Sequence, residues 1–198
     1  MSEHYFTAKP ASADERREIE VSLAGRTIVV ETAPGIFSPG HVDLGTQVLL
    51  RTVPEPTGHL LDLGCGWGPI AIAAALTSPD VSVTAVDVNE RSLDLLRGNA
   101  KRAGVSERVR AVLPEEVADD ERFDVIWSNP PIRIGKDALH ALLGDWLQRM
   151  TPGGQAWLVV QRNLGADSLA GWLANQGWGE VEKVASAKGF RVLRVTAP

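Results

Sequence analysis

The chain has 198 residues with a single cysteine, 44% hydrophobic and 23% charged residues, and a formal net charge of −5 at pH 7. This length suits one domain, and a lone cysteine excludes an internal disulfide, so we expect a cytoplasmic protein. The acidic balance gives no support to nucleic-acid binding by overall positive charge. The longest apolar run, residues 70–76, is too short to span a membrane, and no cysteine–histidine cluster has metal-site spacing. We therefore expect no metal and no membrane partner.

Residues 1–54 are expected to form a polar arm, a β-hairpin and a segment that covers a binding site. Apolar Ile19, Val21 and Leu23 alternate with polar residues, and the alternation resumes at Ile28 after a turn at Ala24-Gly25. This period of two predicts the hairpin. A short helix over residues 42–51 follows and ends before the next prolines.

From residue 55 onwards, strand and helix patterns alternate. The expected strands are residues 59–63, 81–88, 109–113, 123–127, 155–161, 180–185 and 190–196, and the expected helices are residues 69–77, 90–103, 136–150 and 167–176. Residues Pro152-Gly153-Gly154 are expected to stop the third helix, and Asp167 to cap the fourth. The pattern predicts one α/β domain over residues 1–198. Its core, residues 55–198, is a doubly wound seven-stranded sheet with an antiparallel last strand.

The first motif is a glycine-rich loop between the strand 59–63 and the helix 69–77. It reads Asp62-Leu63-Gly64-Cys65-Gly66-Trp67-Gly68-Pro69. Glycines let the backbone approach a ligand, and the helix N-terminus presents free N–H groups. The spacing G-x-G-x-G differs from the G-x-G-x-x-G of dinucleotide binders, which argues against a nicotinamide oxidoreductase. Asp62 suits a ligand with an ammonium group, and Cys65 is interpreted as a small packed residue rather than a nucleophile.

The second motif, Val86-Asp87-Val88-Asn89, ends the next strand. Asp87 follows the glycine loop by about 20 residues, where a carboxylate can accept both hydroxyls of a ribose. The simpler alternative is an acid that stabilises the N-terminus of the following helix. Together, the two motifs predict binding of an adenosine-type nucleoside.

The third motif, Asn129-Pro130-Pro131-Ile132, follows the fourth strand and is expected beside the glycine loop at the carboxyl edge of the sheet. Two prolines fix the backbone and remove two donors, which leaves the Pro130 carbonyl free to accept. With the Asn129 amide oxygen it would form a pair of acceptors for the two hydrogens of an exocyclic or side-chain amide nitrogen. The nitrogen lone pair would then face an electrophile without a general base.

The order of these motifs resembles the class I S-adenosylmethionine-dependent methyltransferases of the N-P-P type, which have a Rossmann-like sheet. Within them the chain is most similar to the small methyltransferase domain, in the single-domain branch of the ribosomal RNA small-subunit (guanine-N2) methyltransferase C family. The resemblance covers nearly the whole chain. Besides the three motifs, it rests on residues 4–6, 37–40, 43–47, 133–136, 160–161, 165–168 and 188–192.

The resemblance implies S-adenosylmethionine as cofactor, S-adenosylhomocysteine as product, and methylation of the exocyclic N2 of a guanine in small-subunit ribosomal RNA. Asn129 and Pro130 would be the catalytic residues, which hold the target nitrogen in line with the methyl group. The residues implied to contact the cofactor are Asp62, Gly64, Cys65, Gly66, Asp87, Val88, Asn89, Glu115 and Asn129. Those implied to contact the substrate are Phe37, Pro131, Ile132 and Arg133.

Two departures from the family pattern concern the substrate. Two-domain members carry an aromatic residue after N-P-P that stacks on the target base, where this chain has Ile132. Stacking would then come from Phe37 or Trp127, or be absent. Those members also have a duplicated N-terminal domain that helps recognise RNA, and we expect no counterpart of it in this chain. Arg133 and Lys136 could instead meet a phosphate of ribosomal RNA or of the small subunit. The alternatives are a protein-glutamine or small-molecule N-methyltransferase and a non-catalytic cofactor-binding module.

Overall fold

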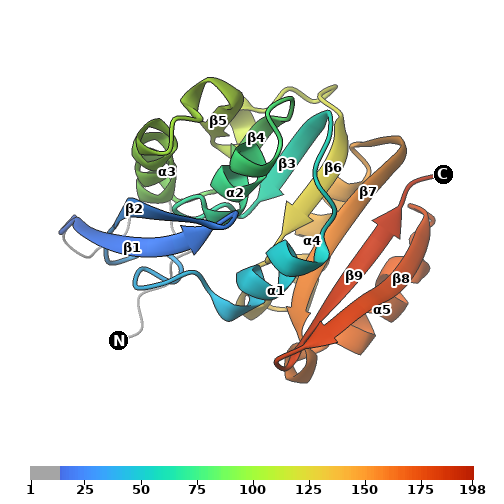
Figure 1. Cartoon of the computed structure of the whole chain (residues 1–198). Coiled ribbons are helices and arrows are strands. Elements are labelled where there is room, and N and C mark those ends of the chain that lie inside the picture. The colour runs from blue at the N-terminus through green and yellow to red at the C-terminus, as the bar shows by residue number, and fades with distance from the viewer. Residues whose placement is uncertain (1–13) are drawn as a thin grey trace.

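A seven-stranded sheet occupies the centre of the molecule, and a separate two-stranded hairpin lies beside it (Figure 1). The computed structural model describes residues 14–198. The strand order is β5-β4-β3-β6-β7-β9-β8, in which β3 to β7 run parallel and β9 runs antiparallel to both of its neighbours. The bounds are β3 His59–Leu63, β4 Ser82–Val86, β5 Val109–Val112, β6 Phe123–Ser128, β7 Met150–Gln161, β8 Glu180–Ala187 and β9 Phe190–Thr196.

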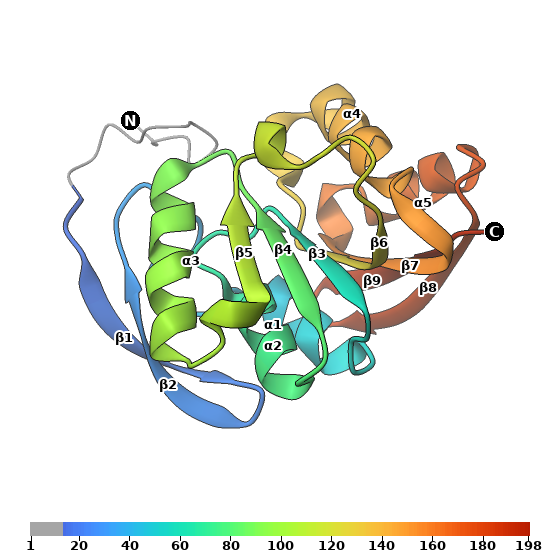
Figure 2. The same cartoon turned by 90° about the horizontal axis from the view of Figure 1, so that it is seen from above.

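Helices cover both faces of this sheet (Figure 2). Alternate residues of each strand point to opposite faces, so Leu60 joins one core cluster and Leu61 the other. The first cluster packs against α1 (Leu44–Thr52), α2 (Pro69–Thr77) and α3 (Glu90–Arg102). The second cluster packs against α4 (Lys136–Leu147) and α5 (Ala166–Ala174). The predicted α/β fold with a seven-stranded sheet and an antiparallel last strand is confirmed.

The hairpin of β1 (Arg17–Leu23) and β2 (Arg26–Thr32) packs its buried Val21, Leu23 and Val30 into the first cluster. The buried side chain of Asn99 in α3 holds the hairpin in place. Asn99 accepts a hydrogen bond from the Glu31 N–H (2.7 Å) and donates to the carbonyls of Glu31 (2.9 Å) and Trp67 (3.2 Å). One amide therefore links the hairpin, α3 and the glycine loop.

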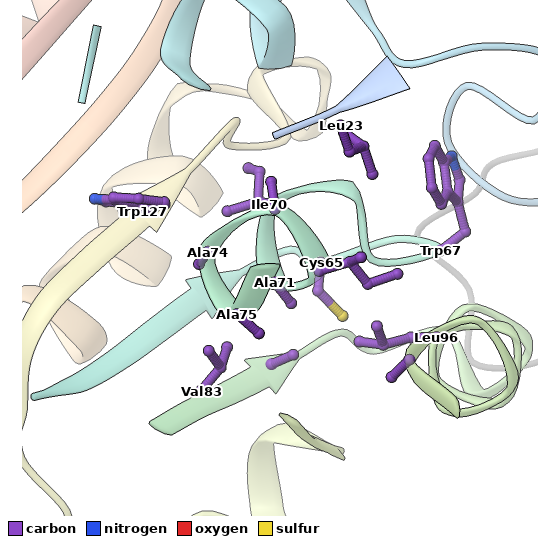
Figure 3. Packing of buried hydrophobic residues seen from close by; sticks show 14 of the residues in the cluster. Leu23, Cys65, Trp67, Ile70, Ala71, Ala74, Ala75, Val83, Leu96 and Trp127 are labelled. Carbon is purple, nitrogen blue, oxygen red and sulfur yellow. The ribbon is translucent and has the colours of Figure 1, made fainter. Parts of the chain in front are cut away.

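Cys65 packs with residues of α2 and its neighbours in the first core cluster (Figure 3). Cys65 is buried, as expected for a packed residue, and its burial raises the pKa of the thiol well above its usual value. Figure 3 shows its sulfur turned toward Leu96 of α3. A nucleophilic role, which needs an accessible thiolate, does not fit this position.

Several of the expected element boundaries are corrected by the structure. The strand expected over 81–88 is β4, Ser82–Val86, and the helix expected over 42–51 is α1, which Asp43 caps. Helix α4 ends at Leu147 instead of residue 150, because the Arg149 carbonyl already accepts the Phe123 N–H (2.9 Å) and Met150 pairs with β6. Residues 152–154 consequently lie inside β7 and do not terminate α4.

The start of α5 is also corrected. Gly165, with φ of 98°, is the N-cap of this helix, and Asp167 is its second residue rather than its cap. The Asp167 carboxylate instead forms ion pairs with Lys183 (2.7 Å) and Arg191, which hold α5 against the last two strands. Two short 3-10 turns that matter for the site are η3 (Ile132–Ile134) and η4 (Arg162–Leu164), and η2 (Pro114–Glu116) follows β5.

Candidate active site

A cavity of about 300 Å³ opens at the carboxyl edge of the sheet. It lies where the strand order reverses between β3 and β6, the position at which open α/β sheets bind ligands. Its lining residues come from every loop at this edge. They are Phe37, Asp43, Leu63, Gly64, Val86, Asp87, Val88, Ser92, Pro114, Asn129, Pro130, Pro131, Ile132, Arg133, Leu142, Trp146, Gln161, Leu164 and Phe190.

The glycine loop forms the floor beside β3. The N–H groups of Gly64 (2.9 Å) and Cys65 (3.0 Å) donate to the Val86 carbonyl, which holds the loop against β4. Gly64 has φ of 79° and lines the cavity, and a β-carbon there would meet no atom within 4 Å. Its bare backbone therefore faces open space. Cys65 and Gly66 line a smaller hollow next to it, together with Phe37 and Asn129.

Gly68 is required by packing, whereas Gly64 faces open space. It has φ of 99°, and a β-carbon there would lie 2.0 Å from Leu96 Cδ1 and 3.4 Å from Ile72 Cδ1. The close approach of the loop to α3 thus requires a residue without a side chain.

Asp62 lies beneath the loop rather than on the cavity wall. It is fully buried, its Oδ2 accepts the Ala71 N–H (3.0 Å), and its Oδ1 has no hydrogen-bond partner among residues 14–198. Burial raises the pKa of Asp62 to about 8; the hydrogen bond from Ala71 opposes this rise, and the Asp87 carboxylate adds to it. Asp62 therefore ties β3 to the start of α2 and keeps one carboxylate oxygen without a partner.

Asp87 and its neighbours form the next part of the wall. Asp87 Oδ2 accepts the Gly66 N–H (2.8 Å) and Oδ1 accepts the Asn89 N–H (2.9 Å). Burial raises the pKa of Asp87, against the lowering effect of these backbone hydrogen bonds. Val88, whose residue surface is 42% exposed, lines the cavity, and so does Pro114. A carboxylate thus stands next to two apolar groups that suit a flat ring.

Like Asp62, two other residues implied to contact a cofactor, Asn89 and Glu115, line neither the cavity nor the smaller hollow beside it. Asn89 is buried and is the N-cap of α3, where its Oδ1 accepts the Arg91 N–H (3.1 Å) and its Nδ2 donates to the Gly35 carbonyl (2.8 Å). Glu115 is exposed in η2, and its neighbour Pro114 lines the cavity in its place.

Asn129 follows β6 and is held by residues of the segment before β3. Its side-chain NH2 donates to Asp43 Oδ2 (2.9 Å) and Thr46 Oγ1 (3.1 Å). Asp43 Oδ2 also accepts the N–H groups of Gly45 (2.8 Å) and Thr46 (3.3 Å), so it acts as an acceptor toward all three donors. Only the NH2 side of the Asn129 amide can face such an oxygen. The amide oxygen is consequently left for a ligand in the cavity.

The Pro130 carbonyl is not entirely free, contrary to expectation. It accepts the Ile132 N–H at 2.8 Å, and Pro131 has φ of −74° and ψ of 73°, which is an inverse γ-turn. A carbonyl oxygen carries two lone pairs, so one remains for a ligand. The turn fixes the direction of that lone pair next to Asn129.

The implied substrate residues Phe37, Pro131, Ile132 and Arg133 all line the cavity. Trp127 does not. It is buried on the α1–α2 face and lines a separate hollow near the starts of β6 and β7, so it offers no stacking surface to the cavity.

Several lining residues were missed by sequence reasoning. Trp146, which is buried in the second core cluster, also lines the cavity, and so does Phe190; neither was among the expected site residues. The Phe190 ring packs on Gly45, where a β-carbon would lie 2.8 Å from its Cε1. Asp43 was detectable as a helix cap from its place before the short helix 44–52, but not as a partner of Asn129.

Within residues 14–198, no group of three or more His, Cys, Asp or Glu side chains is arranged to hold a metal ion. No helix in the same part of the chain has both the length and the apolar character needed to cross a membrane.

Comparison with known proteins agrees with this geometry. The model of the methyltransferase small domain family matches residues 27–194. A Bacillus subtilis (strain 168) protein, "Uncharacterized protein YbxB", is 32% identical over 98% of both chains. The ribosomal RNA small subunit methyltransferase C of Vibrio vulnificus (strain CMCP6) is 35% identical over 75% of this chain and 44% of its own length. The chain thus spans about half of that relative.

Among solved structures, a T. thermophilus 16S rRNA N2 G1207 methyltransferase in complex with AdoMet and guanosine is similar to this chain. The TM-score is 0.81 at 25% identity, over 96% of this chain and 52% of that one. The cavity at the switch point, the glycine loop and the oriented Asn129 are accordingly features of a known enzyme class: the chain belongs to the methyltransferase small domain family.

Proposed function

We propose that this protein transfers the methyl group of S-adenosylmethionine to the exocyclic N2 of a guanine in small-subunit ribosomal RNA. The observation that carries the proposal is the fixed orientation of the Asn129 amide, whose NH2 side is held by Asp43 and Thr46. The similar T. thermophilus enzyme is a 16S rRNA N2 methyltransferase with guanosine in its structure, which supports the same target atom here.

The residues present fit S-adenosylmethionine, which supplies an already activated methyl group when bound. Asp87 would accept the ribose hydroxyls, because each of its oxygens has one lone pair left after accepting a backbone N–H. Val88 and Pro114 would hold the adenine ring between apolar surfaces. The bare backbone of Gly64 would lie against the methionine part, above the unpartnered Oδ1 of Asp62.

In the proposed mechanism, Asn129 and Pro130 act by positioning. The Asn129 amide oxygen and the second lone pair of the Pro130 carbonyl would accept the two N–H groups of the guanine amine. This grip would direct the nitrogen lone pair at the methyl group, and the nitrogen would lose a proton to water after transfer. Because the methyl group is already activated, proximity and alignment would supply the acceleration.

A planar base also suits the aromatic part of the cavity lining. Phe37 and Phe190 both line the cavity, and the Phe190 ring is fixed against Gly45. These rings would supply the stacking surface that Ile132 does not provide.

The test is methyl transfer from labelled S-adenosylmethionine to small ribosomal subunits, and to the RNA freed from them, from cells that lack the protein. Nuclease digestion should place the label in N2-methylguanosine. Asn129→Ala should lower transfer by at least 100-fold and leave cofactor affinity within about twofold. Asn175→Ala, a change of equal size at the end of α5, should change neither transfer nor cofactor affinity. Label in protein glutamine, or transfer by Asn129→Ala at the parent rate, would contradict the proposal.

A further inference from the structure

Seven lysine and arginine side chains within residues 14–198 form neither an ion pair nor a side-chain hydrogen bond with another described residue. They are Arg26, Arg51, Lys101, Arg133, Lys136, Arg162 and Lys188. Most other cations of this acidic protein are paired, as Arg102 is with Glu18 (2.9 Å) and Glu31 (2.7 Å). Four of the seven, Arg133, Lys136, Arg162 and Lys188, lie around the cavity, and we call these four the basic rim.

Two members of the basic rim follow the N-P-P loop. Arg133 lines the cavity from η3, and Lys136 is the first residue of α4. A cation at a helix N-terminus opposes the helix dipole, so helix stability does not explain Lys136 at this place.

The other two members lie in two loops that are joined by a backbone hydrogen bond, next to lining residues of the cavity. Arg162 opens η4, between the lining residues Gln161 and Leu164, and its N–H donates to the Gly189 carbonyl at 2.8 Å. This bond holds η4 against the β8–β9 turn, which carries Lys188.

The backbone of this turn does not explain Lys188 either. Lys188 has φ of 50°, a conformation that favours Asn, Asp or Gly in a two-residue turn. Ala24, with φ of 49°, fills the matching position of the β1–β2 hairpin, so the turn does not require a cation. Local structure therefore accounts for neither Lys136 nor Lys188.

We propose that the basic rim binds phosphates of the RNA strand on both sides of the base that enters the cavity. This inference rests on the proposed function and names the surface through which an acidic protein would hold its RNA. Phosphate contacts position a strand without reading its sequence, which leaves base selection to the cavity. The four cations are spread over three separate loops, so they fit a chain with repeated charges better than a single anion.

Neither of two acidic residues near the basic rim, Asp137 and Asp167, forms an ion pair with a member of the rim. Asp167 is engaged by Lys183 and Arg191, and Asp137, next to Lys136, is the acid in the first turn of α4. Leu164, which is 45% exposed, lies close to Arg162 and offers an apolar surface to a neighbouring base.

The test compares two double variants with the same change of charge. Arg162→Gln/Lys188→Gln removes two rim cations that do not line the cavity. Arg51→Gln/Lys101→Gln removes two unpaired cations from the last turns of α1 and α3, at the opposite edge of the sheet. The probe is a fluorescein-labelled single-stranded oligoribonucleotide that contains guanine, and binding is followed by anisotropy over a range of salt concentrations.

The rim variant should bind the oligoribonucleotide about tenfold more weakly at physiological salt. Its dependence of log K on log salt should be shallower by about 1.4, the value for two phosphate contacts to a single strand. The control variant should change affinity by less than about twofold, and both variants should keep the parent affinity for S-adenosylmethionine and the parent stability to urea.

Equal losses in the two variants, or a rim variant that binds RNA like the parent, would overturn the inference. Displacement of the parent from RNA by polyglutamate at concentrations where polyuridylate fails to displace it would also overturn it, in favour of an acidic protein partner. The binding assay involves no methyl transfer. Rim-dependent RNA binding together with label in protein glutamine would therefore refute the proposed function and leave the rim assignment standing.

Discussion

Replacement of Asp43 tests whether the orientation of Asn129 controls methyl transfer. One oxygen of Asp43 accepts three N–H groups: two from the backbone at the start of α1 and one from the side chain of Asn129. Asp43 therefore caps a helix and positions the acceptor that would hold the target nitrogen. The two roles can be separated, because asparagine caps helices as well as aspartate does but carries no charge.

The expected magnitudes follow from these bonds. A charge-assisted hydrogen bond contributes about 1.5–3 kcal/mol, so Asp43→Ala should slow transfer by about 10- to 150-fold and should also lose about 1 kcal/mol of stability from the cap. Asp43→Asn keeps an acceptor for the cap and should change stability by only a few tenths of a kcal/mol. Its neutral hydrogen bond to Asn129 is weaker by about 1 kcal/mol, which predicts an approximately fivefold slower transfer.

Three measurements on each variant check this reasoning. Urea unfolding gives stability, titration with S-adenosylmethionine gives cofactor affinity, and initial rates on small ribosomal subunits separate kcat from KM. Thr46→Val, which removes the second and neutral partner of Asn129, should resemble Asp43→Asn in rate. The positioning role is refuted if Asp43→Asn transfers at the parent rate while Asp43→Ala loses activity only in proportion to its stability.

Two further predictions concern stability. Gly68→Ala should destabilise the protein by about 3 kcal/mol in urea unfolding, because it combines a left-handed backbone with a clash against buried Leu96. Gly98→Ala inside α3 is the control. A β-carbon there meets nothing within 4 Å, so this variant should be more stable by about 0.5–1 kcal/mol. Because the pKa of Asp62 is about 8 in the folded protein and 3.8 ordinarily, the folded state holds a proton that the unfolded chain has released between these values. Stability without cofactor should therefore fall as pH rises from 4 to 8, by up to about 1.4 kcal/mol per pH unit, and Asp62→Asn should remove this contribution from the pH profile. A parent pH profile that matches the Asp62→Asn profile would contradict the buried position of this carboxylate.

Local pattern was enough to predict most of the fold. The strand 59–63 and the helix 69–77 were predicted with the bounds that β3 and α2 have, because an apolar run ends at a glycine loop and a proline opens the helix. The convergence of the three motifs was also predictable, since parallel strands place their carboxyl ends at one edge of a sheet. The end of α4 was not predictable in this way. Its apolar periodicity continues to Met150, but Met150 pairs with β6 and belongs to β7.

The sequence by itself determined the alternation of strands and helices, the glycine loop, the carboxylate after the second strand and the N-P-P segment, because each depends on residues that are close along the chain. Only the tertiary structure decided what these residues do together. Asn129 is oriented by Asp43, which lies 86 residues earlier, and the hairpin is tied to α3 by Asn99 across 68 residues. The periodicity of apolar residues along the chain cannot predict such contacts. They arise when the sheet closes and buried polar groups must find partners, wherever in the chain those partners lie.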